Sequence, residues 1–113
     1  MLNDLEMRKL ETYFGFLKRE KGFFVGRRLE SELQKDEIKF LIVFPSFSEK
    51  SKQNLIGLCK VDCFVLEYTG NIEVYKFLNQ KQIKAVGIHD ANLGKAILDL
   101  LKKDMEAVNK GGC

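Results

Sequence analysis

Five consecutive apolar residues, Phe40-Leu41-Ile42-Val43-Phe44, are followed directly by the only proline of the chain, Pro45. An apolar run without polar alternation is typical of a strand that is buried on both faces. Such a strand needs covering layers on both sides of its sheet, and helices are the usual cover. This segment therefore predicts a layered α/β fold.

Predicted helices alternate with short apolar strands along the whole chain. We expect the strands at residues 23–25, 40–44, 63–68 and 84–89. Helices are expected to open at a capping box of Asn3 and Glu6, near Gly26, at a capping box of Ser46 and Glu49, at Ile72 and at Asp90. This order predicts a single-domain three-layer α/β/α sandwich around a small, four-stranded mixed sheet, most of it parallel. The domain is expected to span residues 1–108, with a disordered tail at 109–113.

The composition excludes several classes of protein. With 113 residues, 45% hydrophobic and 31% charged, the chain fits one globular domain. A net charge of +3 is too small for a binder that relies on bulk charge, so any nucleic-acid site must be a local basic patch. The acidic N-terminus is unlike a signal peptide, and no apolar run is long enough to span a membrane. Together with the odd number of cysteines, this predicts a cytoplasmic protein with reduced thiols and no membrane partner.

Gly26, Arg27 and Arg28 open the second predicted helix and form the first candidate site. A helix N-terminus offers unpaired N–H groups and partial positive charge, which favour phosphate binding. Glycine permits close approach of an RNA backbone, and an arginine fork can hold a phosphate or a guanine edge. Further cations precede them at Lys18, Arg19 and Lys21. The alternative is an ordinary solvated helix start.

Residues 79–84, with the sequence NQKQIK, form the second candidate site. This polar and basic segment precedes the last predicted strand and carries Lys81 and Lys84. The alternative is an ordinary surface loop.

Residue types that serve catalysis or metal binding are sparse. Cys59 and Cys63 are spaced C-x3-C, and a zinc site would need both His89 and Cys113 as further ligands, so we expect core thiols. His89 has no nucleophile in a hydrolase-like motif, and its neighbour Asp90 suits helix capping. We therefore expect no enzymatic activity, cofactor, metal or small-molecule substrate. A deep pocket lined by His89, Asp90 and another titratable group would reverse this expectation.

Four aromatic residues, Phe40, Phe44, Phe64 and Tyr68, lie within or beside the predicted strands. They could be stacking platforms for RNA bases. Their alternate positions in apolar strands favour a place in the core.

Two stretches resemble one known family. Residues 14–26, FGFLKREKGFFVG, are similar to the opening L-G-L-A-x-R-A-x-K-x-x-x-G of small bacterial YlxQ-like proteins, with Gly15, Arg19 and Gly26 in register. Residues 85–101, AVGIHDANLGKAILDLL, resemble their closing segment.

These proteins belong to the superfamily of ribosomal protein L-seven-Ae, ribosomal protein L-thirty-e and Gadd-forty-five. The resemblance covers nearly the whole chain and implies an α/β/α sandwich that binds structured RNA, often a kink-turn, without catalysis. It also implies RNA contacts at residues 26–28 and 79–84.

The chain departs from the kink-turn signature of that superfamily, G-x-N-E-x-x-K. Gly26 matches its glycine, whereas Arg28, Leu29 and Glu32 replace its Asn, Glu and Lys. Two alternatives follow. In the first, the protein is ribosome-associated and binds ribosomal RNA or a kink-turn-like element, with main contacts from Gly26, Arg27, Arg28, Lys18 and Arg19 and weaker ones from Lys81 and Lys84. In the second, the same fold binds a ribosomal or other protein and no RNA.

Overall fold

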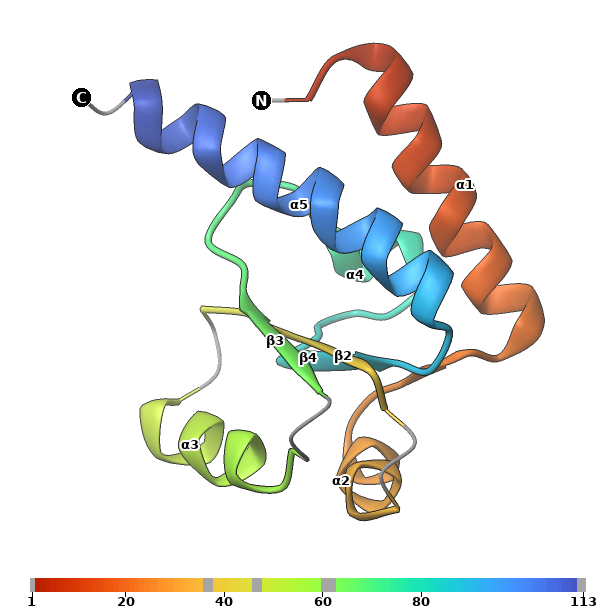
Figure 1. Ribbon diagram of the computed structural model, residues 1–113, viewed down its shortest axis with the longest axis vertical. Helices are drawn as coiled ribbons and strands as arrows, with labels where there is room; N and C mark the ends of the chain where they lie inside the picture. Colours follow the sequence, from red (N-terminus) through yellow and green to blue (C-terminus); the bar gives the residue numbers. More distant parts are fainter. Residues whose placement is uncertain (1, 36–37, 46–47, 60–62, 112–113) are drawn as a thin grey trace.

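A computed structural model of the chain describes residues 2–35, 38–45, 48–59 and 63–111, with side chains up to Met105 in the last helix (Figure 1). The strands are β1 (Phe23–Phe24), β2 (Phe40–Val43), β3 (Phe64–Glu67) and β4 (Ala85–Ile88). The helices are α1 (Asp4–Glu20), α2 (Arg27–Gln34), α3 (Glu49–Gly57), α4 (Val74–Phe77) and α5 (Ala91–Gly111). Each strand is one or two residues shorter than predicted, and the order of elements is as predicted.

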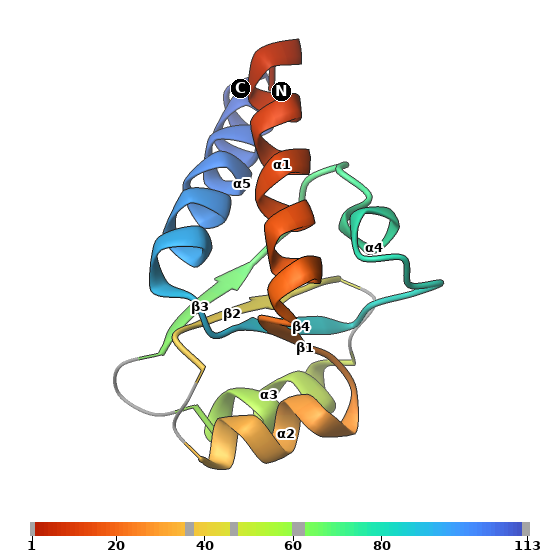
Figure 2. The same cartoon turned by 90° about the vertical axis from the view of Figure 1, so that its right-hand side faces the viewer.

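The layers confirm the predicted fold class, a three-layer α/β/α arrangement around a four-stranded mixed sheet. Helices α1, α4 and α5 lie on one face of the sheet, and α2 and α3 lie on the other (Figure 2). Strand β2 supplies side chains to both faces. Ile42 belongs to the apolar cluster under α1 and α5, whereas Leu41 and Val43 belong to the cluster under α2 and α3. Successive strand residues point to opposite faces, so the strand is buried on both sides, as its sequence predicts.

The direction of β4 corrects one prediction. The strand order is β1-β4-β2-β3, and β4 runs antiparallel to both β1 and β2, so only β2 and β3 are parallel. The expectation of a mostly parallel sheet was wrong. The helix before β4 has four residues and spans about 6 Å, whereas a four-residue strand spans about 13 Å. Helix α4 is therefore too short to run the length of a strand, and β4 begins at the end where β3 stops, since Val43 pairs with both Glu67 and Ala85.

The helix starts follow from their capping residues. The Glu6 N–H donates to the Asn3 Oδ1 at 2.8 Å, and the Asn3 N–H donates to the Glu6 Oε1 at 3.1 Å, so the first predicted capping box is confirmed. The Asp90 Oδ1 accepts from the backbone N–H groups of Asn92 and Leu93 at 2.8 and 3.0 Å, as expected of an N-cap. These caps fix where α1 and α5 begin.

The start of α3 and the end of α5 differ from prediction. The cap of α3 is Ser48, whose Oγ accepts from the Ser51 N–H at 3.3 Å, and Glu49 is the first helical residue. Glu49 is therefore one residue after the cap, and a capping box needs it three residues after; Ser46 lies outside the described residues.

Helix α5 continues to Gly111 and so includes the first three residues of the predicted disordered tail. No proline or glycine follows Gly94 before Gly111, so helix propagation is not interrupted earlier.

The edge strand β3 also differs from prediction. Phe64 is 63% exposed and Val65 is 36% exposed, so the expectation of a core position for Phe64 was wrong. Among the described residues no strand lies beyond β3 in the sheet, so these side chains are at its edge. The Phe64 ring stacks on the Phe40 ring at a centroid distance of 6.0 Å. Phe40 and Phe44 pack against the α1/α5 cluster and Tyr68 is 2% exposed, so the other three positions are confirmed.

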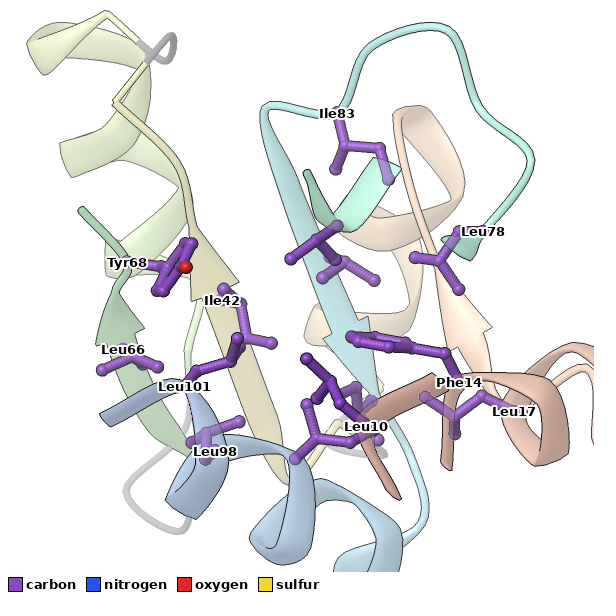
Figure 3. Close-up of a cluster of buried hydrophobic side chains, with 14 of the residues drawn as sticks. Leu10, Phe14, Leu17, Ile42, Leu66, Tyr68, Leu78, Ile83, Leu98 and Leu101 are labelled. Carbon is purple, nitrogen blue, oxygen red and sulfur yellow. The ribbon is translucent and has the colours of Figure 1, made fainter. Parts of the chain in front are cut away.

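Tyr68 joins the end of β3 to α5 (Figure 3). Its hydroxyl donates to the Asp104 Oδ2 at 2.7 Å and accepts from the Ile72 N–H at 2.9 Å. Asp104 is 5% exposed, so this carboxylate is buried with its donor. The contact links the loop after β3 to the last helix.

We expect the stability of the protein to fall as the pH rises above about 10, and Tyr68→Phe to weaken that fall. Burial raises the pKa of Tyr68 above its usual value of 10.0, and the hydrogen bond to Asp104 is the second-largest cause of the increase. A folded-state pKa above the unfolded one gives stability that is complete below pH 10 and is lost as the pH rises towards the folded pKa. Urea unfolding at a series of alkaline pH values would measure this. Equal slopes for the wild type and Tyr68→Phe would contradict it.

Candidate RNA interface

A groove of 740 Å³ lies between the start of α2, helix α3 and the loop that enters β4; we call it the α2 groove. Its apolar lining residues are buried or half-buried, namely Val25, Leu29, Leu55, Leu58, Ile83 and Ala85. Its polar lining residues are exposed, namely Arg27, Glu30, Ser51, Asn54, Gln80, Gln82 and Lys84. Parts of both segments selected from the sequence therefore meet in one groove: Gly26 and Arg27 from residues 26–28, and Gln80, Gln82, Ile83 and Lys84 from residues 79–84.

Gly26 is the N-cap of α2 and has a backbone conformation that favours glycine. Its φ is 64° and its ψ is −141°, a region that L side chains rarely adopt. No atom lies within 4 Å of the place where a Cβ would sit, so the backbone at this position is open to a ligand. The N–H groups in the first turn of α2 point towards this end of the helix. Gly26 thus places a helix N-terminus with open backbone at the edge of the α2 groove.

Arg27 and Arg28 point to different sides because neighbouring helical residues are about 100° apart. Arg27 lines the α2 groove. The Arg28 guanidinium lies over the Phe24 ring, 5.2 Å from its centroid, and lines a separate depression of 400 Å³ with Lys18 and Lys21. We call this depression the Lys18 hollow. It shares Val25 with the α2 groove, so the two depressions are neighbours.

The remaining predicted cations are more scattered. Lys81 lines a third depression of 520 Å³, which also contains Glu73 and shares Gln82 and Ile83 with the α2 groove. The Arg19 guanidinium lies over the Phe16 ring at 5.4 Å and lines none of the three depressions. The structure therefore brings Gly26, Arg27 and Lys84 together, and Lys18 with Arg28, whereas Arg19 stands apart.

Two acids on α2 have different environments. Glu30 is exposed and lines the α2 groove with Arg27. Glu32 is 9% exposed, and its Oε1 lies 3.6 Å from the Lys35 Nζ. Glu30 is thus the acid that interrupts the positive potential of the groove, and Glu32 does not line it.

Sequence reasoning missed the contribution of α3. Ser51 and Asn54 come from this helix and line the α2 groove opposite the start of α2. Their only signal is a spacing of three, which places both on one helix face. That spacing does not say which other element the face meets.

The other candidate residues lie outside the α2 groove. His89 is exposed, and its backbone N–H donates to the Gly22 carbonyl at 3.1 Å. Cys59 and Cys63 are half-buried and pack against the α2/α3 cluster, and burial raises the pKa of the Cys59 thiol. Cys113 lies outside the described residues.

The described residues contain neither a helix suited to spanning a membrane nor a metal-binding cluster. None of the described helices combines the length and the apolar character needed to cross a bilayer. Among the described residues, no group of three or more His, Cys, Asp or Glu side chains is placed to hold a metal ion.

Comparison with known proteins supports the fold. No family model matches the chain, and no curated protein matches it. Among solved structures, a protein of unknown function from Bacillus halodurans is similar, with a TM-score of 0.68 and 16% sequence identity. The match covers 83% of this chain and 97% of that one. At this identity the likeness shows a shared fold and no more.

Proposed function

We propose that the protein is a non-catalytic RNA-binding protein of the ribosomal protein L-seven-Ae superfamily, acting in the cytoplasm on structured RNA such as ribosomal RNA. In this proposal it is part of a ribonucleoprotein, and the α2 groove is its main RNA contact. One observation carries the proposal: Gly26 and Arg27 line the same groove as Lys84, more than 50 residues away, and both positions were selected as RNA contacts from the sequence.

The chemistry of the α2 groove suits a nucleotide chain. Arg27 and Lys84 can hold phosphates, and the N–H groups beside Gly26 can add hydrogen bonds. The exposed amides of Asn54 and Gln82 can contact sugars or base edges above the apolar lining. Glu30 repels phosphate on its side of the groove, so the backbone is expected to pass by Arg27 and Lys84.

Fluorescence anisotropy with labelled RNA tests the proposal. We expect the double variant Arg27→Glu with Lys84→Glu to weaken binding by about a hundredfold or more, because hydrogen bonds to charged groups contribute about 1.5–3 kcal/mol each and about 1.4 kcal/mol is tenfold in affinity. The matched control is Arg8→Glu with Lys9→Glu, the same change in charge at exposed positions of α1, on the opposite face of the sheet (Figure 2). Titrations would use a kink-turn RNA and a fully paired hairpin at two salt concentrations.

Two results would overturn the proposal. One is no RNA affinity of the wild type above a neutral control protein at low salt. The other is an equal loss in the groove variant and the α1 control, since bulk charge would then explain the binding. Thermal unfolding of both variants would confirm that they fold.

A second candidate is a protein-interaction module, which Glu30 favours. Glu30 and Arg27 together give the groove both signs of charge beside an apolar lining, as is usual for protein interfaces. Co-purification of a protein partner that survives nuclease treatment, and that is lost on Arg27→Glu, would support it. Failure to retain any partner would count against it.

A further inference from the structure

We infer that the Lys18 hollow is a phosphate site that holds the backbone of the same RNA beside the α2 groove. This inference rests on the proposed function and adds a second contact to it. The hollow would take phosphate groups of the polynucleotide and read no base.

The cations of the hollow come from separate parts of the chain. Lys18 lies in the last turn of α1, Lys21 is the C-cap of that helix, and Arg28 lies in the first turn of α2. The other lining residues are neutral: Phe23, Phe24, Val25, Leu78 and Asn79. Three positive side chains thus converge on a depression of 400 Å³ that has no acid among its described lining residues.

These cations are not used in ion pairs with the described carboxylates. The salt bridges found between described residues involve other lysines, namely Lys35, Lys52, Lys76 and Lys103. Like charges that are brought together without a counter-charge repel one another. Binding of an anion in the hollow would relieve that repulsion, and this relief favours a phosphate over a neutral base.

Contact with an aromatic ring restricts the position of the Arg28 side chain. Its guanidinium lies 5.2 Å from the centroid of the Phe24 ring, and Phe24 is half-buried against the α2/α3 cluster. A guanidinium that stacks on an aromatic ring keeps its N–H edge available for hydrogen bonds. Because the ring is fixed by packing, less side-chain entropy is lost when Arg28 binds a phosphate.

The hollow continues into the α2 groove along two stretches of chain. Both depressions contain Val25, and Asn79 of the hollow precedes Gln80 of the groove. Gly26 lines the groove directly after the shared Val25, and no atom lies within 4 Å of an added Cβ there. One RNA strand can therefore cross Gly26 and contact both depressions.

The salt dependence of RNA affinity tests this inference. The variant Lys18→Gln with Lys21→Gly removes two charges of the hollow. Lys21 has a φ of 54°, and glycine is preferred at a left-handed helix C-cap, so this variant is expected to fold. Each phosphate contact contributes about 0.7–0.9 to the slope of log affinity against log salt. We therefore expect the magnitude of this negative slope to decrease by about 1.5, so that binding depends less on salt. The ratio of affinities for kink-turn and paired RNA should not change.

The matched control is Arg8→Gln with Lys9→Gln, which removes two exposed charges from α1 away from the hollow. A single variant, Arg28→Gln, checks the third cation by the same slope. If the hollow variants and the control give the same slope as the wild type, while Arg27→Glu with Lys84→Glu weakens binding, the inference is overturned and the proposed function stands. If the wild type binds no RNA, the proposed function itself fails.

Discussion

Phe14→Ala is expected to lower the free energy of unfolding by about 3–5 kcal/mol, the usual range for loss of a buried aromatic ring. Phe14 lies on α1, is 0% exposed, and stacks on Phe77 of α4 with a centroid distance of 5.4 Å and an interplanar angle of 8°. Figure 3 shows the ring among Leu10, Leu17 and Leu78. Truncation would leave a cavity between α1 and α4, because side chains from both helices surround the ring.

This variant also tests how the core supports the candidate interface. Phe77 is the last residue of α4, and the chain then passes through Leu78 and Asn79 of the Lys18 hollow and Gln80 of the α2 groove. Loss of the stack would remove packing that holds this loop in place. We expect folded Phe14→Ala to bind RNA more weakly than the wild type at a temperature well below its unfolding midpoint.

Urea unfolding measures the stability part of this prediction. Phe14→Leu is the matched control, because it keeps most of the buried volume and should lose much less stability. A loss below about 1 kcal/mol for Phe14→Ala would mean that the space between α1 and α4 can collapse, contrary to the close packing expected of a core.

The fold could be predicted from the sequence where the signal is local. The apolar run at 40–44 identified β2, because a strand without polar residues has to be covered on both faces. Asn3 and Asp90 placed the starts of α1 and α5, because a capping side chain acts within three residues of itself.

The errors arose where the outcome depends on distant parts of the chain. Phe64 has the residue type of a core position, and its exposure follows from the place of β3 at the sheet edge. The direction of β4 depends on the path of the whole connection from Glu67 to Ala85, which local residue patterns do not specify. Ser46 was selected as a cap because Glu49 lies three residues after it, whereas Glu49 is the first residue of α3 and Ser48 is its cap.

The candidate interface was predictable in part for the same reason. Gly26 was selected by local helix-terminus chemistry, and its positive φ agrees with that choice. Arg27 and Arg28 are neighbours in sequence and were predicted to form one site. In the helix they point to different sides, so Arg27 lines the α2 groove and Arg28 lines the Lys18 hollow. Ser51 and Asn54 could not be selected, because their proximity to Arg27 exists only after α2 and α3 pack on the same face of the sheet.

Gly70→Ala is expected to be strongly destabilising, through the buried contact between Tyr68 and Asp104. An added Cβ would overlap the Tyr68 hydroxyl and the Asp104 Oδ2, and it would lie 2.6 Å from the Tyr68 Cζ. Overpacking costs about 1–3 kcal/mol. Displacing the hydroxyl would also break its buried hydrogen bond to Asp104, which adds about 1–3 kcal/mol.

A double-mutant cycle with Tyr68→Phe separates this mechanism from a general effect of alanine in a loop. Tyr68→Phe removes the hydroxyl that the new Cβ would meet and frees the Asp104 carboxylate to move aside. Gly70→Ala should therefore cost less in the Tyr68→Phe background than in the wild type, with a coupling of about 0.5–3 kcal/mol. Gly57→Ala, at the last residue of α3, is the control for an added Cβ that meets no atom within 4 Å. The ring carbon Cζ stays 2.6 Å from the added Cβ in the double variant, so part of the loss is expected to remain. Additive losses in the cycle would show that contact with the Tyr68 hydroxyl contributes nothing to the cost.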